Sequence, residues 1–167
     1  MTEKDEQARG LVPVQYHQFD ISDEDGPAGP ELERVHNGLV RVTDGVIVVM
    51  TGIHTGDVDV TVALHQTEPA PDNGEWQEIV EISASSVSGE LSVRGMMDDL
   101  EEEHPALSFD GPGEYRLRIH ARGRDTAVDL APDEVTEWYL IQSWPSSIHE
   151  VTVLRQTDSY GASVRAD

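Results

Sequence analysis

The chain has 167 residues, no cysteine and a formal net charge of −22. Without cysteine, disulfide bonds and thiolate metal sites are excluded, and the strong negative charge argues against direct binding to nucleic acid or to an anionic membrane. No apolar run reaches the roughly 18 residues of a transmembrane helix. The charged N-terminal residues also lack the apolar stretch of a secretory signal, so we expect a cytoplasmic protein.

Short apolar runs separated by turns dominate the chain. We expect residues 1–10 to be a disordered tail and residues 11–167 a single domain, because valine, isoleucine and leucine recur only after the tail. In chain order the predicted strands are 11–21, 39–50 with a turn at 43–45, 57–65, 75–85, 90–94, 107–109, 114–121, 137–144 and 149–155, followed by an edge strand or ordered tail. This pattern predicts an all-β fold with little helix, either an antiparallel sandwich or a barrel, and of the two we expect an antiparallel β-sandwich of about eight strands.

The segment 106–125 has the clearest strand–turn–strand pattern. Its second strand alternates strictly, which places Leu117 and Ile119 on one face and Arg116 and Arg118 on the other. We expect the arginine face to pair with carboxylates on neighbouring strands rather than to bind an anion. The candidate carboxylates are Asp57, Asp59, Glu78 and Glu81.

Catalytic patterns are missing from the sequence. The seven histidines are scattered, and none has the close spacing that places two metal ligands on one face. Nucleophile elbows and phosphate-binding loops are missing too. We therefore expect a protein that is not an enzyme and that has no cofactor and no catalytic metal; the alternative is an enzyme whose scattered histidines converge in the folded chain.

Two ligand hypotheses remain open beside a purely structural role. A loop rich in acids suits calcium, although the EF-hand spacing is missing. Its residues are Asp23, Glu24 and Asp25. Aromatic residues near the C-terminus suit sugar stacking, but alternation places Trp138 and Trp144 on one side, which favours packing or a partner surface. Tyr139 lies between them.

The densest acidic cluster lies between the predicted strands 90–94 and 107–109. It consists of Asp98, Asp99, Glu101, Glu102 and Glu103. Such a charge run is either a solvated loop or a surface that binds a basic protein. We take it as the candidate partner-binding site.

Two short motifs resemble the competence protein J (ComJ) family, whose members inhibit a DNA-entry nuclease. The first is Tyr16-His17-Gln18-Phe19, and the second runs from Leu107 to Leu117 and includes Phe109 and Tyr115. The likeness is close in these motifs and loose over residues 12–122. The chain departs from the family pattern in its acidic C-terminal section and in the insert at 98–103.

The resemblance implies an inhibitor or immunity-type protein that masks the basic cleft of a nuclease. The acidic cluster would then present carboxylates where the phosphates of DNA lie, with fast and salt-sensitive association. The partner would be a basic protein, and nucleic acid itself would not bind. The alternative is a β-sandwich module for carbohydrate or calcium, without a nuclease partner.

Overall fold

The described chain folds into one continuous β-sheet. The structure, a computed structural model, describes residues 6–24, 27–28, 37–43, 45–70, 72, 74–95 and 104–166. These residues contain ten strands and one short helix. In chain order the elements are β1 (Glu6–Gln15), β2 (Gln18–Ser22), β3 (Val40–Thr43), β4 (Val46–Met50), β5 (Thr55–Leu64), β6 (Glu78–Ser86), β7 (Ser92–Arg94), β8 (Gly113–Arg122), β9 (Trp138–Pro145), β10 (Thr152–Gln156) and α1 (Ser159–Ala166).

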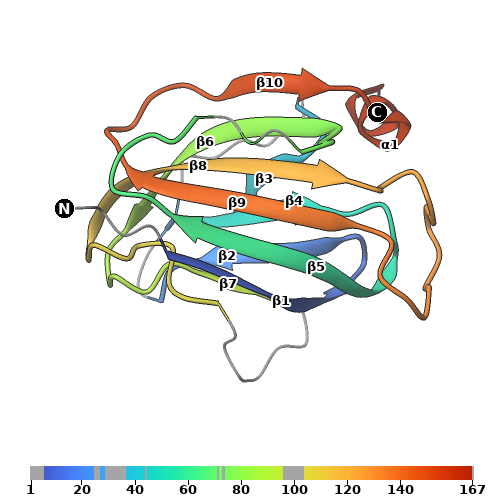
Figure 1. Ribbon diagram of the computed structural model, residues 1–167, viewed down its shortest axis with the longest axis horizontal. Helices are drawn as coiled ribbons and strands as arrows, with labels where there is room; N and C mark the ends of the chain where they lie inside the picture. Colours follow the sequence, from blue (N-terminus) through green and yellow to red (C-terminus); the bar gives the residue numbers. More distant parts are fainter. Residues whose placement is uncertain are drawn as a thin grey trace.

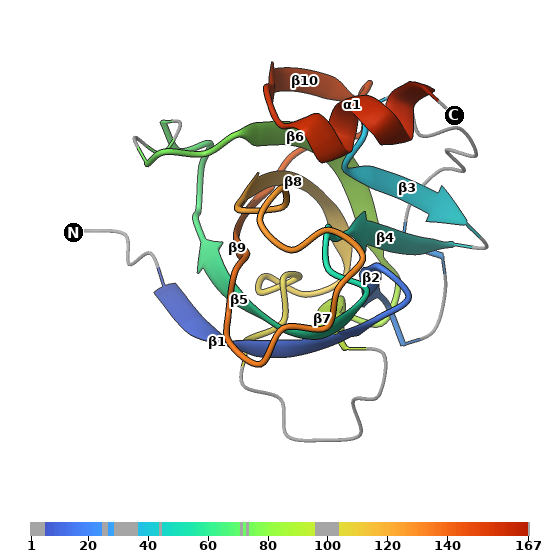
Figure 2. The same cartoon turned by 90° about the vertical axis from the view of Figure 1, so that its right-hand side faces the viewer.

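The sheet curls into a half-barrel. Its strand order is β10-β6-β8-β9-β5-β1-β2-β4-β3, and β7 pairs with β2 outside this path. Figure 1 shows neighbouring strands side by side, and Figure 2 looks at the curl from one end. Most neighbours are antiparallel, but β5 and β9 run parallel, with Val60 opposite Tyr139.

The all-β class predicted from the sequence is confirmed, whereas the antiparallel sandwich of about eight strands is wrong. Side-chain alternation is the same in a curled sheet and in a sandwich, because both bury one face of each strand. Alternation therefore identifies strands without identifying their partners. The parallel contact between β5 and β9 joins segments that are far apart in the sequence, and it keeps the strands in one sheet.

Most predicted strands are shifted by a few residues, and three segments differ in kind from the prediction. Strand β1 begins at Glu6, opposite Leu64, so residues 6–10 belong to a strand rather than to a disordered tail. Residues 107–109 form no strand, and β8 pairs instead with β6 and β9. The C-terminal residues form helix α1 rather than an edge strand or tail.

The core lies inside the curl. Leu117 and Ile119 on β8 point into it, as alternation predicts, and meet Val60 and Val62 on β5 in one apolar cluster. All four side chains are fully buried. Since full burial of such a side chain contributes about 1.5–3 kcal/mol, this cluster is the main source of stability.

The outer face of β8 carries the arginines and is also buried. Arg118 Nε lies 2.9 Å from Glu81 Oε2, and Arg116 Nε lies 3.2 Å from Glu81 Oε1. Arg118 Nη1 donates to the carbonyl oxygen of Pro69, and Arg116 Nη2 donates to that of Glu150. The predicted pairing with Glu81 is confirmed, and two chain segments cover the face.

Of the other three predicted partners, the two aspartates lie elsewhere, and Glu78 pairs with the arginine just beyond this face. Asp57 and Asp59 are on β5, which β9 separates from β8, and Asp59 pairs with Arg9 at 2.7 Å. Glu78 is on β6 but lies next to Arg124, with 3.8 Å between Oε1 and Nη2. Alternation thus predicted which face is charged, and strand order decided which carboxylate meets it.

Candidate functional site

Three connections and the helix gather at one end of the half-barrel. They are the β1–β2 turn, the 51–54 connection, the 123–137 loop and α1, all on the right of Figure 1 and toward the viewer in Figure 2. We call this region the tyrosine end. It is defined by Tyr16, His17, His54, Asp129, Leu130 and Tyr160.

Backbone hydrogen bonds join the three connections. The His17 N–H donates to the His54 carbonyl at 3.2 Å, and the His54 N–H donates to the Leu130 carbonyl at 2.8 Å. The Asp129 N–H donates to the carbonyl of Gly52 at 2.9 Å. The 51–54 connection is thus held between the other two, which fixes the side chains that all three present.

His17 lies at the centre of the tyrosine end. Its Nε2 is 2.6 Å from Asp129 Oδ1, and its Nδ1 is 2.9 Å from the carbonyl oxygen of Thr51. The hydroxyl oxygen of Tyr160 lies 3.3 Å from the same Nδ1. The His17 ring stacks on Tyr160 at 5.8 Å and meets His54 edge-on at 5.4 Å.

The backbone at this end is strained. Tyr16, His17 and Asp129 have φ angles of 55°, 65° and 63°, and they are the non-glycine residues with positive φ in the described part of the chain. The left-handed conformation costs a non-glycine residue roughly 1–2 kcal/mol. Such strain persists only where the surroundings enforce it, and it concentrates at functional sites.

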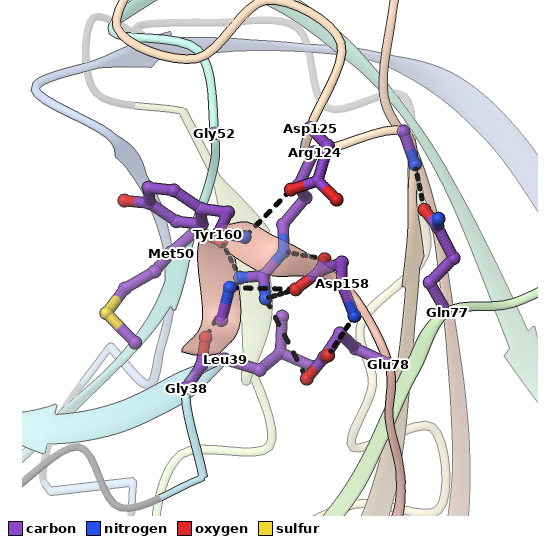
Figure 3. Close-up of polar contacts among 12 residues, drawn as sticks. Gly38, Leu39, Met50, Gly52, Gln77, Glu78, Arg124, Asp125, Asp158 and Tyr160 are labelled. Atoms are coloured by element: carbon purple, nitrogen blue, oxygen red, sulfur yellow. Dashed lines mark hydrogen bonds and ion pairs between the residues drawn. The ribbon is translucent and has the colours of Figure 1, made fainter. Parts of the chain in front are cut away.

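Arg124 anchors the helix to this end, as Figure 3 shows. Its guanidinium is fully buried and donates to both carboxylate oxygens of Asp158, from Nε at 2.8 Å and from Nη2 at 2.9 Å. Nη1 donates to the carbonyl oxygens of Gly38 and Met50, each at 3.0 Å. The guanidinium also lies 5.0 Å from the ring centroid of Tyr160.

Two carboxylates cap the first turn of α1. Asp158 Oδ1 accepts from the Gly161 N–H at 2.8 Å, and Asp125 accepts from the N–H groups of Ser159 and Tyr160. These bonds satisfy backbone donors that a helix leaves unpaired. Capping and the arginine contact together hold Tyr160 against His17.

Glu78 is a buried acid beneath α1. Its Oε2 accepts from the Asp158 N–H at 3.0 Å, and its Oε1 lies 3.6 Å from Arg165 Nη1. Burial, with the charge of Asp158 adding to it, raises the pKa of Glu78 to about 7. Burial also favours neutral Asp158, but the hydrogen bonds and charge of Arg124 outweigh it and lower the pKa of Asp158.

A second buried acid supports the 51–54 connection. Glu137 accepts hydrogen bonds from the N–H groups of Gly52 and Ile53 and from the Tyr139 hydroxyl. Burial raises the pKa of Glu137. Its contacts are structural, because each one fixes backbone or core.

The motif residues are divided between the two ends of the molecule. Tyr16 and His17 belong to the tyrosine end, whereas Phe19 lies in the core with its ring 5.2 Å from that of Tyr139. Gln18 donates to Asp20 at 3.2 Å. At the opposite end the rings of Phe109 and Tyr115 lie 6.0 Å apart, and the Tyr115 hydroxyl donates to the Gly111 carbonyl.

The predicted acidic site lies outside the described residues, so it stays a prediction. Its residues are Asp98, Asp99, Glu101, Glu102 and Glu103. Sequence reasoning identified only the two motif residues of the tyrosine end. His54, Asp129 and Tyr160 come from distant segments, and no local spacing connects them to His17.

The loop acids proposed for calcium are engaged in other contacts. Asp23 Oδ1 accepts from the hydroxyls of Ser86 and Ser88, and Glu24 lies 3.4 Å from Arg94. Asp25 is outside the described residues. Across the described chain, no group of three or more histidine or carboxylate side chains is placed to hold a metal ion.

An open cavity of about 540 Å³ lies on the outer face of the sheet. It is lined by Glu75, Gln77, Arg122, Gly123 and Trp138. The Arg122 guanidinium lies 5.2 Å from the ring centroid of Trp138 and the same distance from that of Trp76. Trp138 and Trp144 share this face, as alternation predicted, and Trp144 stacks on Arg118.

Comparison with known proteins shows what this fold is similar to. No family model and no curated protein matches the sequence. ComJ from Bacillus subtilis, described as an inhibitor of the DNA degrading activity of NucA, superposes with a TM-score of 0.58 at 15% identity. The match covers 86% of this chain and all of ComJ.

A second solved structure, described as crocagin biosynthetic gene J, has a TM-score of 0.56 at 15% identity. It matches over 87% of this chain and 100% of its own length. The likeness to ComJ that two short motifs indicated therefore extends to the fold. Within the described residues, no helix has the length and hydrophobicity needed to cross a membrane.

Proposed function

We propose that this chain is a non-enzymatic inhibitor that binds the basic cleft of a nuclease and keeps DNA out of it. The observation that carries the proposal is the fold likeness to ComJ, a nuclease inhibitor, over most of both chains. A shared fold does not by itself define function, so the electrostatics of this chain must agree with the role.

The charge distribution supports an inhibitor of a basic protein. The net charge is −22, and no lysine or arginine occurs between residues 125 and 154. In the 123–137 loop the carboxylate residues Asp125, Asp129, Asp133 and Glu134 are exposed. Carboxylates compete for the cationic side chains that would otherwise hold the phosphates of DNA, and they accelerate association.

A nuclease-protection assay tests the proposal. The purified chain is mixed with each nuclease encoded beside its gene, and degradation of linear DNA is followed against inhibitor concentration. We expect protection that saturates near one inhibitor per nuclease and weakens between low salt and about 0.3 M, because exposed charges are screened. Failure to protect DNA from any of these nucleases at low salt would refute the function.

A second candidate function is carbohydrate binding at the outer cavity. The observation that favours it is an indole, Trp138, beside the planar polar groups of Glu75, Gln77 and Arg122 around an open volume of about 540 Å³. Ligand that binds only the folded state raises the melting temperature. A glycan panel measured by thermal shift, with Trp138→Ala as the control, separates this function from nuclease inhibition.

A further inference from the structure

We infer that the tyrosine end is the surface that contacts the partner, with Tyr16 as its aromatic anchor and Leu130 beside it. The inference rests on the proposed function and adds the binding face and the chemistry of the partner's surface. The surface of the partner is an apolar pocket bordered by lysine or arginine side chains.

Exposed apolar side chains identify the centre of the surface. Tyr16 is 69% exposed, Leu130 59% and Val128 38%. The Tyr16 ring meets the His54 ring edge-on at 5.3 Å, and the His54 N–H donates to the Leu130 carbonyl. Tyrosine anchors surrounded by water-excluding contacts carry much of the energy in protein interfaces.

The anchor is held in place before binding. The Tyr16 backbone is in the left-handed region, and the next residue, His17, is fixed by Asp129, Thr51 and Tyr160. A rigid side chain loses little conformational entropy on association, so more of its contact energy appears as affinity.

Charge complementarity identifies the occupant. The exposed carboxylates of Asp125, Asp129, Asp133 and Glu134 belong to the same loop as Leu130. The neighbouring Arg124 is fully buried against Asp158, so its charge is not presented to a partner. An apolar centre with a negative rim matches a basic protein. An acidic partner would bring its own carboxylates against this rim, and the like charges would repel each other.

The first test removes the apolar centre without disturbing the fold. Tyr16→Asn deletes the ring and keeps a residue that tolerates positive φ, and Leu130→Ser deletes an exposed leucine. The matched control is Val87→Ser at the opposite end, where Val87 is 58% exposed. We expect each change at the tyrosine end to raise the inhibition constant by roughly 30-fold, with an unchanged or higher melting temperature for Tyr16→Asn.

The second test removes charge from the rim. Asp133→Asn with Glu134→Gln is compared with Asp110→Asn and Glu90→Gln, two exposed acids at the opposite end. Each double variant removes the same charge. Only the pair at the tyrosine end is expected to slow association and to flatten its salt dependence, because rim charges act mainly on the association rate.

The results separate the inference from the function on which it rests. Loss of inhibition at the tyrosine end with retention in both controls supports the docking surface. If the wild-type chain inhibits and the two ends respond equally, the docking surface is refuted while the function stands. If the wild-type chain protects DNA from none of the nucleases, both are refuted.

Discussion

Both ends of the half-barrel contain turns in which glycine has a positive φ, but among the described residues only one end also has residues other than glycine in this conformation. At the end that carries the 87–89 and 110–113 turns, Gly89 and Gly111 take φ angles of 84° and 92°. At the tyrosine end, Gly123 also has a positive φ, of 90°, but three residues other than glycine, Tyr16, His17 and Asp129, have φ angles of 55–65° as well. Glycine adopts this region without a Cβ penalty, whereas the other residues pay a backbone energy for it.

The difference shows where particular side chains are kept although they raise the conformational energy of the backbone. The glycine-rich end is closed by Asp23, which accepts hydrogen bonds from Ser86 and Ser88. The tyrosine end keeps two strained residues in contact, with His17 Nε2 2.6 Å from Asp129 Oδ1. Strain that is kept where glycine would relieve it indicates that these side chains have a use.

The largest expected effect is on stability, when the buried polar residue that holds each end together is replaced. Arg124→Met should lower the free energy of unfolding by about 3–5 kcal/mol, because it leaves Asp158 buried without its cation and leaves Glu78 with Arg165 alone. Asp23→Ala at the other end should cost about 1–2 kcal/mol, since it removes hydrogen bonds that are partly open to water.

Urea unfolding measures both changes, and Arg124→Lys, which keeps the charge and loses donors, should fall between wild type and Arg124→Met. Equal losses from Arg124→Met and Asp23→Ala would show that the buried ion pair contributes no more to the free energy of unfolding than the partly exposed hydrogen bonds of Asp23.

The next largest effect is the pH dependence of the folding stability, and it comes from the tyrosine end. The folded pKa of Glu78 is about 7 against an ordinary value of 4.5, so the folded state binds the extra proton. Stability from Glu78 is therefore complete below about pH 4.5 and is lost as the pH rises through about 7, by on the order of 1–3 kcal/mol.

Glu78→Gln should remove this loss, and the difference between variant and wild type isolates it. The comparison with wild type is needed because a second group also titrates in this range. Burial lowers the pKa of His120 to about 4, so its contribution makes stability rise with pH between about pH 4 and 6.5. Hydrogen-exchange protection, corrected for intrinsic rates, should fall in α1 at high pH before it falls in β8. A pH-independent difference would contradict the account.

The smallest expected effect is on stability, when one residue with positive φ is exchanged in a turn at each end. Tyr16→Gly should stabilise the fold by about 1 kcal/mol, because it relieves the left-handed strain. Gly111→Ala should destabilise it by about the same amount, and purely through the backbone, since a Cβ at Gly111 would meet nothing within 4 Å. Thermal unfolding reports both, and a loss on Tyr16→Gly would mean that contacts of the ring outweigh the strain.

The sequence alone determined most of the strands and the two faces of β8. Alternation at 114–121 predicted that Leu117 and Ile119 are inside, and charge predicted that Glu81 pairs with the arginines. These features are predictable because a strand's side chains alternate by local geometry, whatever the strand lies beside. The motif Tyr16-His17 also identified two of the six residues that define the candidate site.

Only the tertiary structure decided the half-barrel and the tyrosine end. The parallel pairing of β5 with β9 depends on how the sheet closes, and no local pattern encodes it. Helix α1 has a glycine in its first turn and is held by Arg124 and Asp125 rather than by helix propensity. His17, His54, Asp129 and Tyr160 meet because three connections and this helix end at the same edge of the sheet, which is a long-range property of the chain.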